Sequence, residues 1–126
     1  MKIRIGNGFD VHKLQAGTSI TLCGLNIPHT KKLLGHSDAD VALHALTDSI
    51  FGALCKGDIG VHFPPTDEKW RDVESKIFLQ KALILMDELR YSISNLDITI
   101  VCEAPKIKDH SLAMRTNIAN ICNSSA

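Results

Sequence analysis

The chain has 126 residues, of which 44% are hydrophobic, and its 14 basic residues balance its 14 acidic ones. This length predicts a single domain over residues 1–126, with enough apolar side chains for an aliphatic core. A formal net charge of zero argues against a nucleic-acid-binding protein, which would carry a basic face. The sequence has no membrane-length apolar run and no signal-peptide pattern, so we expect a soluble, cytoplasmic protein without a membrane partner.

The N-terminal residues have the alternation of a half-buried strand, because Ile3 and Ile5 are separated by polar residues. Gly6 and Gly8 then allow a bend or a close backbone approach. In an extended chain residues two apart share one face, so Asp10 and His12 are expected to point at one place. Two short strands, 19–22 and 25–27, are predicted around Gly24.

The rest of the chain predicts alternating helical and extended segments. Apolar residues recur at helical spacing in three segments, and Ser37 or Asp38 is a suitable N-cap for the first of them, with Gly57 as its end. The predicted helices are 39–55, 75–89 and 108–121. Residues 57–67 contain two glycines and two prolines, so we expect a loop. Residues 96–102 alternate as a strand, and the absence of a regular crossover rhythm favours the α+β class.

Four cysteines lie far apart in the sequence, at positions 23, 55, 102 and 122. Their even number leaves disulfides possible, but none has Cys-x-x-Cys spacing. We expect reduced thiols packed in the core.

The first predicted helix places Asp40, His44 and Asp48 four residues apart, on one stripe. Asp10, His12 and His44 would then form a set of three ligands, which is the number that catalytic zinc sites use. Asp40 or Asp48 could hold an imidazole by its second nitrogen. The spacing also allows a plainer interpretation, in which Asp10 caps a turn, His12 is exposed and His44 is a core histidine bonded to Asp48.

Three further stretches are candidates for ligand contacts. His36 and Ser37 precede the helix, where backbone amides attract anions, although a helix cap would also explain Ser37. The glycines of GDIG at 57–60 would let a ligand approach, or form an ordinary turn. Lys106 follows a proline that ends the strand over 96–102, and a lone lysine is more often a solvated charge.

Together these stretches resemble the 2-C-methyl-D-erythritol 2,4-cyclodiphosphate synthase family of non-mevalonate isoprenoid biosynthesis. The resemblance rests on GNGFDVHKL, LLGHSDADVALHALTDSIFGAL, GDIGVHFPPTD, LDITIVCEAPKIKDH and MRTNIA, and covers nearly the whole chain. It implies a phosphorus–oxygen lyase that converts 4-diphosphocytidyl-2-C-methyl-D-erythritol 2-phosphate to the cyclodiphosphate and releases CMP. It also implies a homotrimer with active sites between subunits. In such a trimer a mixed sheet would be packed against helices on one side and face the threefold axis.

The resemblance implies a role for each matching residue. Asp10, His12 and His44 would bind Zn²⁺, with a second cation, Mg²⁺ or Mn²⁺, at the diphosphate. His36 and Asp48 would be catalytic, and Asp10 and His12 would also meet the substrate. The other implied substrate contacts are His36 and Ser37 at the phosphates, then Asp58, Ile59, Gly60, Phe63, Pro64, Pro65, Thr66 and Asp67 at the methylerythritol, then Cys102, Glu103, Ala104, Pro105, Lys106, Ile107 and Lys108 at the nucleotide.

Two departures from the family pattern affect these expectations. Pro65 stands where the family often has Asp, which removes a carboxylate and a backbone donor. We also expect the domain to lack the family's C-terminal strand region, with its Thr-rich turn that helps hold the diphosphate and cytidine. The alternative functions are a non-catalytic, metal-binding oligomeric module and a zinc-dependent phosphohydrolase.

Overall fold

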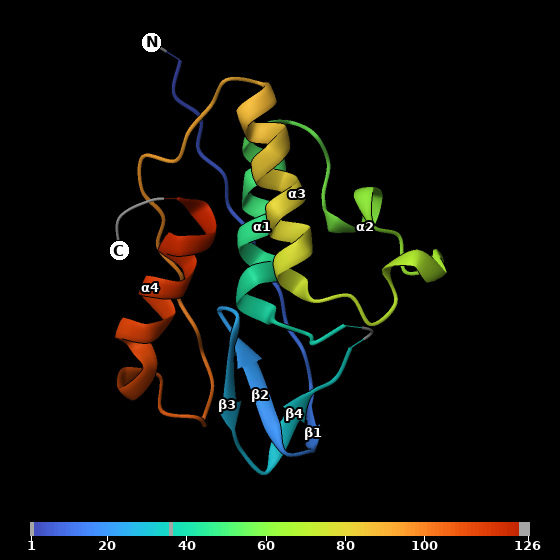
Figure 1. Ribbon diagram of the computed structural model, residues 1–126, viewed down its shortest axis with the longest axis vertical. Coiled ribbons are helices and arrows are strands. Elements are labelled where there is room, and N and C mark those ends of the chain that lie inside the picture. Colours follow the sequence, from blue (N-terminus) through green and yellow to red (C-terminus); the bar gives the residue numbers. More distant parts are fainter. Residues whose placement is uncertain (1, 36, 124–126) are drawn as a thin grey trace.

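Two helices packed side by side form the centre of the structure, a computed structural model that describes residues 2–35 and 37–123 (Figure 1). They are α1 (Val41–Ala53) and α3 (Ser75–Glu88). Leu43 of α1 and Leu79 and Ala82 of α3 are completely buried. This contact between the two amphipathic helices therefore forms the main core of the protein.

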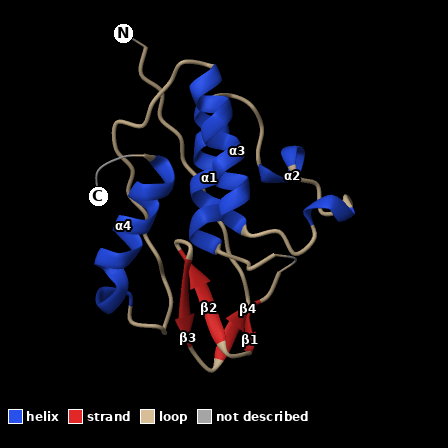
Figure 2. Cartoon of the chain, in the orientation of Figure 1, coloured by secondary structure: helices blue, strands red, loops and turns tan. Residues whose placement is uncertain are grey.

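Four short strands form two antiparallel pairs below the helices (Figure 2). The strands are β1 (Leu14–Ala16), β2 (Ser19–Leu22), β3 (Leu25–Pro28) and β4 (Lys31–Leu33). In the order of the chain β2 and β3 form an inner hairpin between β1 and β4, and β1 pairs directly with β4. The inner hairpin turns at Cys23 and Gly24, which have φ angles of 54° and 76°. Two successive positive φ angles suit the twist of a tight hairpin, and this hairpin was predicted.

The remaining elements flank the central helices on opposite sides (Figure 1). They are α2 (Ile59–His62), a 3-10 turn (Glu68–Trp70), a second 3-10 turn (Ile107–His110) and α4 (Ser111–Cys122). The α2 turn packs against α1, whereas α4 packs against α3 and β3. Separate small sheets beside packed helices confirm the α+β class. In the described part of the chain, no helix has the length and apolarity to cross a membrane.

Two predicted strands are absent as strands. Residues 2–5 and 96–102 are extended, but in the described chain neither is assigned to a sheet, so the expected mixed sheet is replaced by two small antiparallel ones. The alternation that suggested the second strand is real, because Ile98 and Ile100 pack on the core while Thr99 and Val101 are exposed. Alternation reports which face is buried, whereas a strand also needs a backbone partner.

The ends of the helices differ from those predicted. Asp40, rather than Ser37 or Asp38, is the N-cap of α1. The helix ends at Leu54, followed by Cys55 with a φ of 57°, so the left-handed residue comes before Gly57. The predicted 57–67 loop contains α2, which Asp58 caps, and is otherwise irregular.

The N-cap carboxylate of Asp40 is completely buried and satisfied by the backbone. It accepts hydrogen bonds from the amides of Leu43 at 3.0 Å, Cys23 at 3.0 Å and Gly24 at 2.7 Å. One side chain thus caps α1 and also fastens the tip of the inner hairpin to the helix. Burial, together with the charge of Asp38, raises the pKa of Asp40 to about 6 although the three amides lower it.

The four cysteines are all free thiols, but only Cys23 belongs to the core. Cys55 and Cys102 are exposed, and Cys122 is half-buried. The prediction of four core cysteines was therefore wrong for the two exposed ones. They lie after the end of α1 and in the unpaired 96–102 segment, where the apolar pattern does not produce full burial.

Candidate active site

Two glycines bring the N-terminal segment into contact with α1. A Cβ on Gly8 would lie 1.7 Å from the carbonyl oxygen of Ala45, and one on Gly6 would lie 1.8 Å from that of Ser49. Only glycine permits backbone contact this close. Beyond Gly8 the segment alternates, so Asp10 and His12 turn inward as predicted, while Val11 between them is exposed.

Replacing Gly8 with alanine is expected to push this segment away from α1 and to lower the free energy of unfolding by about 1–3 kcal/mol. Urea denaturation measures the change. Gly52→Ala is the matched control, because a Cβ there meets nothing within 4 Å and alanine favours a helix. Equal stability of the Gly8 variant and the parent would contradict the close contact.

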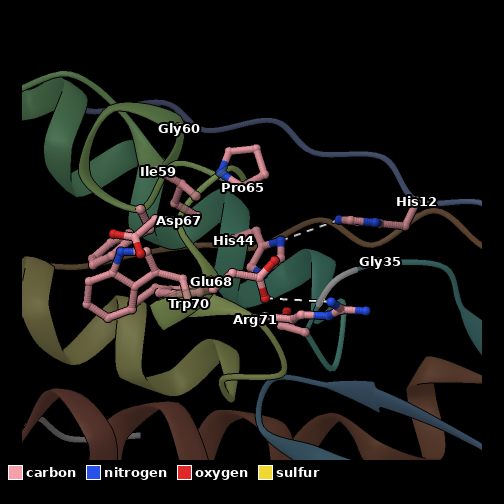
Figure 3. Close-up of a pocket in the computed structure, with 13 residues that line it drawn as sticks. His12, Gly35, His44, Ile59, Gly60, Pro65, Asp67, Glu68, Trp70 and Arg71 are labelled. Atoms are coloured by element: carbon pink, nitrogen blue, oxygen red, sulfur yellow. Dashed lines mark hydrogen bonds and ion pairs between the residues drawn. The ribbon is translucent and has the colours of Figure 1, made fainter.

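Asp10, His12 and His44 come together as the ligand hypothesis required. The Oδ2 atom of Asp10 lies 2.9 Å from Nε2 of His12 and 3.2 Å from Nδ1 of His44. These two imidazole nitrogens are 3.3 Å apart (Figure 3). One carboxylate oxygen and two imidazole nitrogens facing one point are a donor set that suits a divalent transition metal, Zn²⁺ included.

The outer nitrogens of both imidazoles also have partners. Nδ1 of His12 donates to the carbonyl oxygen of Leu34 at 2.8 Å, which leaves Nε2 as the inward lone pair of a neutral ring. Nε2 of His44 lies 2.8 Å from Oγ of Ser75. The expectation that Asp40 or Asp48 would hold an imidazole was therefore wrong: Asp40 is used by backbone amides, and Asp48 faces another loop.

The Asp10 carboxylate is held in its charged form. Burial alone would raise its pKa, but the contacts with the imidazoles of His44 and His12 outweigh burial, and the pKa lies below its ordinary value. A carboxylate that stays charged beside two imidazole nitrogens suits the binding of a cation.

A cavity of about 400 Å³ opens beside His12 and His44 (Figure 3). Eight of the residues named from the sequence line this cavity. They are His12, Ser37, His44, Ile59, Gly60, Phe63, Pro65 and Asp67. His36 lies outside the described residues.

The cavity also has lining residues that sequence reasoning missed. Gly35, Glu68, Trp70, Arg71 and Phe78 complete its wall. The indole of Trp70 packs edge-on against Phe63, with ring centroids 4.8 Å apart, and the guanidinium of Arg71 lies 3.6 Å from the Glu68 carboxylate. No motif marks Glu68, Trp70 and Arg71, because their place in the wall depends on how the 63–71 loop folds.

Asp48 fixes the loop that borders this cavity. Its Oδ1 atom accepts from the amide of Ile59 at 2.8 Å, while Asp58 accepts from the amide of Val61 at 2.9 Å. Burial raises the pKa of Asp48 above its ordinary value, and the charge of nearby Asp58 adds to this although the Ile59 amide opposes it. Asp48 thus holds the start of α2 against α1, and Asp58 caps α2.

The expected nucleotide wall lies at a second cavity of about 380 Å³. Residues 102–105 line one side of it and residues 8–12 the other, so His12 borders both cavities. Some of the named residues are absent from both linings in the described chain. These are Asp48, Asp58, Pro64, Thr66, Lys106, Ile107 and Lys108.

Comparison with known proteins identifies the family and the fold of the chain. The profile of the YgbB family matches residues 3–126. The chain belongs to the YgbB family. A curated YgbB-type relative, 2-C-methyl-D-erythritol 2,4-cyclodiphosphate synthase of Roseobacter denitrificans, is 54% identical over 121 residues, which are 96% of this chain and 76% of that protein.

Other YgbB relatives are longer. The bifunctional enzyme IspD/IspF of Paracoccus denitrificans is 55% identical over 121 residues, and this chain spans 32% of its length. A solved structure of 2C-methyl-D-erythritol-2,4-cyclodiphosphate synthase in a CDP-bound form superposes with a TM-score of 0.91 at 37% identity. That superposition covers 97% of this chain and 81% of the other. The fold of the YgbB family is therefore established for this chain.

Proposed function

We propose that the protein converts 4-diphosphocytidyl-2-C-methyl-D-erythritol 2-phosphate to 2-C-methyl-D-erythritol 2,4-cyclodiphosphate with release of CMP. The observation that carries this proposal is the cluster of Asp10, His12 and His44, two members of which, His12 and His44, line the 400 Å³ cavity, in a chain 54% identical to a synthase of that name. The donor set and the neighbouring cavity suit a small phosphorylated substrate bound next to a metal.

The reaction needs positioning and charge neutralisation more than an activated nucleophile. An oxygen of the 2-phosphate attacks the β-phosphorus of the diphosphate, and a new P–O bond forms. The anhydride P–O bond to the α-phosphate breaks, and CMP leaves with that oxygen. Since the attacking phosphate is already an anion, no serine or cysteine has to be activated, and holding the two phosphates together supplies much of the rate.

We propose Zn²⁺ as the metal at Asp10, His12 and His44, with Mg²⁺ or Mn²⁺ as a second cation at the diphosphate. The inward oxygen and nitrogens of these residues support a bound ion. A bound zinc ion would supply Lewis-acid stabilisation of charge on a phosphate.

Other residues of this chain would bind and orient the substrate. We assign the methylerythritol to the loop at Asp58, Ile59 and Gly60, with Asp48 as the catalytic-site residue that holds this loop. Phe63, Pro64, Pro65, Thr66 and Asp67 would continue this wall. Pro65 faces the cavity with an apolar ring, so its contact would be by packing alone (Figure 3).

The two ends of the substrate would lie on either side of this wall. His36 and Ser37 would meet phosphates, and residues 102–108 of a neighbouring subunit would meet the nucleotide. This arrangement follows from a trimer whose active sites lie between subunits. A cytoplasmic location stays a prediction from the sequence.

Product analysis tests the proposed reaction. The zinc-loaded protein is incubated with the substrate and Mg²⁺, and the products are resolved by ³¹P NMR and nucleotide chromatography. We expect cyclic diphosphate and CMP in equal amounts. Release of inorganic phosphate would instead indicate a zinc-dependent phosphohydrolase, and metal binding without turnover would indicate a non-catalytic module.

The protein is also proposed to be a homotrimer. Several large apolar side chains of the extended segments are open to solvent: Ile3, Ile5, Phe9, Val11 and Val101. Exposed apolar side chains gathered on these segments support an interface between subunits that buries the outer face of the segments. Multi-angle light scattering is expected to give three times the 13.8 kDa of the chain.

Ile5→Asp is expected to break this assembly, because Ile5 is 91% exposed in the single chain and a buried, unpaired charge would be placed in the interface. Leu112→Asp is the matched control, since Leu112 is an exposed leucine on α4, away from the N-terminal segment. A monomeric parent, or an Ile5 variant that remains trimeric, would contradict the assignment of this face.

A further inference from the structure

We propose that Ser75, supported by Asp38, is a positioning residue that sets the tautomer of His44 so that its Nδ1 lone pair points at the metal site. The proposal rests on the metal site proposed above and names a residue outside the ligand set. Ser75 is completely buried at the first position of α3, while His44 belongs to α1. The contact between the two central helices therefore also orients a ligand.

The hydrogen bonds around the Ser75 hydroxyl determine which atom holds each proton. Oγ of Ser75 lies 2.8 Å from Nε2 of His44 and is also hydrogen-bonded to Oδ1 of Asp38. The backbone amide of Ser75 donates to the other Asp38 oxygen at 3.2 Å. Oγ of Ser37 lies 3.3 Å from the same hydroxyl.

A hydroxyl donates one hydrogen bond and accepts two, whereas a carboxylate only accepts. The single proton of Ser75 therefore goes to Asp38, and its oxygen accepts from Nε2–H of His44 and from Ser37. A neutral imidazole with a proton on Nε2 has none on Nδ1. The inward nitrogen of His44 is then a free lone pair beside Asp10 and His12, which is the form that binds a metal.

The position of Ser75 at the start of α3 leaves its hydroxyl free for these contacts. The N-cap of the helix is Glu74, and Ser75 is the first helical residue, so its hydroxyl is not the capping group. It is turned toward Asp38 and His44.

His12 provides a comparison within the same site. Its outer nitrogen donates to a backbone carbonyl, that of Leu34. A carbonyl has no proton to donate, so it can only favour the tautomer that leaves the inner nitrogen free. Ser75 needs Asp38 to act in the same way, because a hydroxyl alone could either donate or accept.

Ser75→Ala tests the proposal by two measurements that do not depend on activity. Long-range ¹H–¹⁵N correlation spectra of the metal-free protein, taken at about pH 9 where an imidazole is neutral, report which nitrogen of His44 carries the proton. We expect Nε2–H in the parent and a mixture of tautomers in the variant. Zinc affinity, measured by competition with a chromophoric chelator, is expected to fall by about 10–100-fold.

Two further variants make the comparison specific. Ser75→Thr keeps the hydroxyl, and its zinc affinity is expected to lie within about threefold of that of the parent. This change is smaller than the loss of zinc affinity expected when the hydroxyl is removed. Thr47→Val removes a different completely buried hydroxyl, which lies on α1 and donates to the Leu43 carbonyl. This change should leave zinc affinity unchanged.

The outcomes separate this inference from the metal proposal. Unchanged zinc affinity in Ser75→Ala, beside a parent that binds zinc, overturns the positioning role. A parent that binds no zinc overturns the metal proposal, and the His44 spectrum of the parent still decides the role of Ser75. A proton on Nδ1 in the metal-free parent overturns that role whether or not the alanine variant folds.

Discussion

Replacing His44 with alanine is expected to remove nearly all bound zinc and to lower the rate of cyclisation about 10³-fold or more. The variant leaves one carboxylate and one imidazole at the site, fewer than the three protein ligands of catalytic zinc centres. A bound metal stabilises transition-state charge by several kcal/mol, and each 1.36 kcal/mol is a factor of ten in rate. Elemental analysis after dialysis measures the metal, and ³¹P NMR measures the rate.

His29→Ala is the matched control for this experiment. His29 lies between β3 and β4, and its Nδ1 accepts only from the amide of Lys31 at 3.1 Å. The His29→Ala variant should retain zinc and activity. Full zinc occupancy in the His44 variant would remove His44 from the ligand set and leave the inward arrangement of the three residues without a function.

Asp40→Ala is expected to have the largest effect on stability, lowering the free energy of unfolding by about 3–5 kcal/mol. The change would leave the buried amides of Cys23, Gly24 and Leu43 without an acceptor, and each unsatisfied group costs roughly 1–3 kcal/mol before relaxation. Urea denaturation followed by circular dichroism measures the loss. Asp67→Ala, which removes one exposed capping bond to Lys69, should cost no more than about 1 kcal/mol.

The pH dependence of stability provides a separate test of the same carboxyl group. Its pKa is about 6 in the folded protein and lies at 3.8 for a free side chain, so the folded state binds this proton more tightly. The stabilising contribution of the proton is complete below pH 3.8 and is lost as the pH rises through 6. The loss from this group is about 3 kcal/mol.

Asp40→Asn has no proton to lose and isolates this contribution. The difference in unfolding free energy between parent and variant, measured from pH 4 to 7, is expected to shift by about 2 kcal/mol against the parent. A constant difference over this range would show that the carboxyl group titrates normally. The absolute stability of the variant does not enter the comparison.

The ligand set could be predicted because it depends on local geometry. Alternation in an extended segment places Asp10 and His12 on one face whether or not the segment is paired in a sheet, and the glycines before them permit contact with a helix. Whether residues 2–5 or 96–102 pair with a neighbouring strand could not be predicted from the sequence. Whether an extended segment has a hydrogen-bonded partner depends on what lies beside it.

The outer contacts of the imidazoles could not be predicted for a related reason. From the sequence, Asp40 and Asp48 were the natural partners because they share a helical stripe with His44. The structure uses both for backbone amides and takes its partners for the imidazoles from Leu34 and Ser75. Ser75 is 31 residues from His44 in the sequence. From the sequence alone, a serine at the start of a predicted helix is interpreted as an ordinary helix cap.

The contact of Gly6 and Gly8 with α1 also determines the order in which the site can form during synthesis. Asp10 and His12 leave the ribosome first, but the surface that receives them consists of helix backbone at Ala45 and Ser49, made more than 30 residues later. The N-terminal segment must therefore wait, unfolded, until α1 exists. Long-range contacts of this kind slow folding, so Asp10 and His12 meet His44 only late in the folding of the nascent chain.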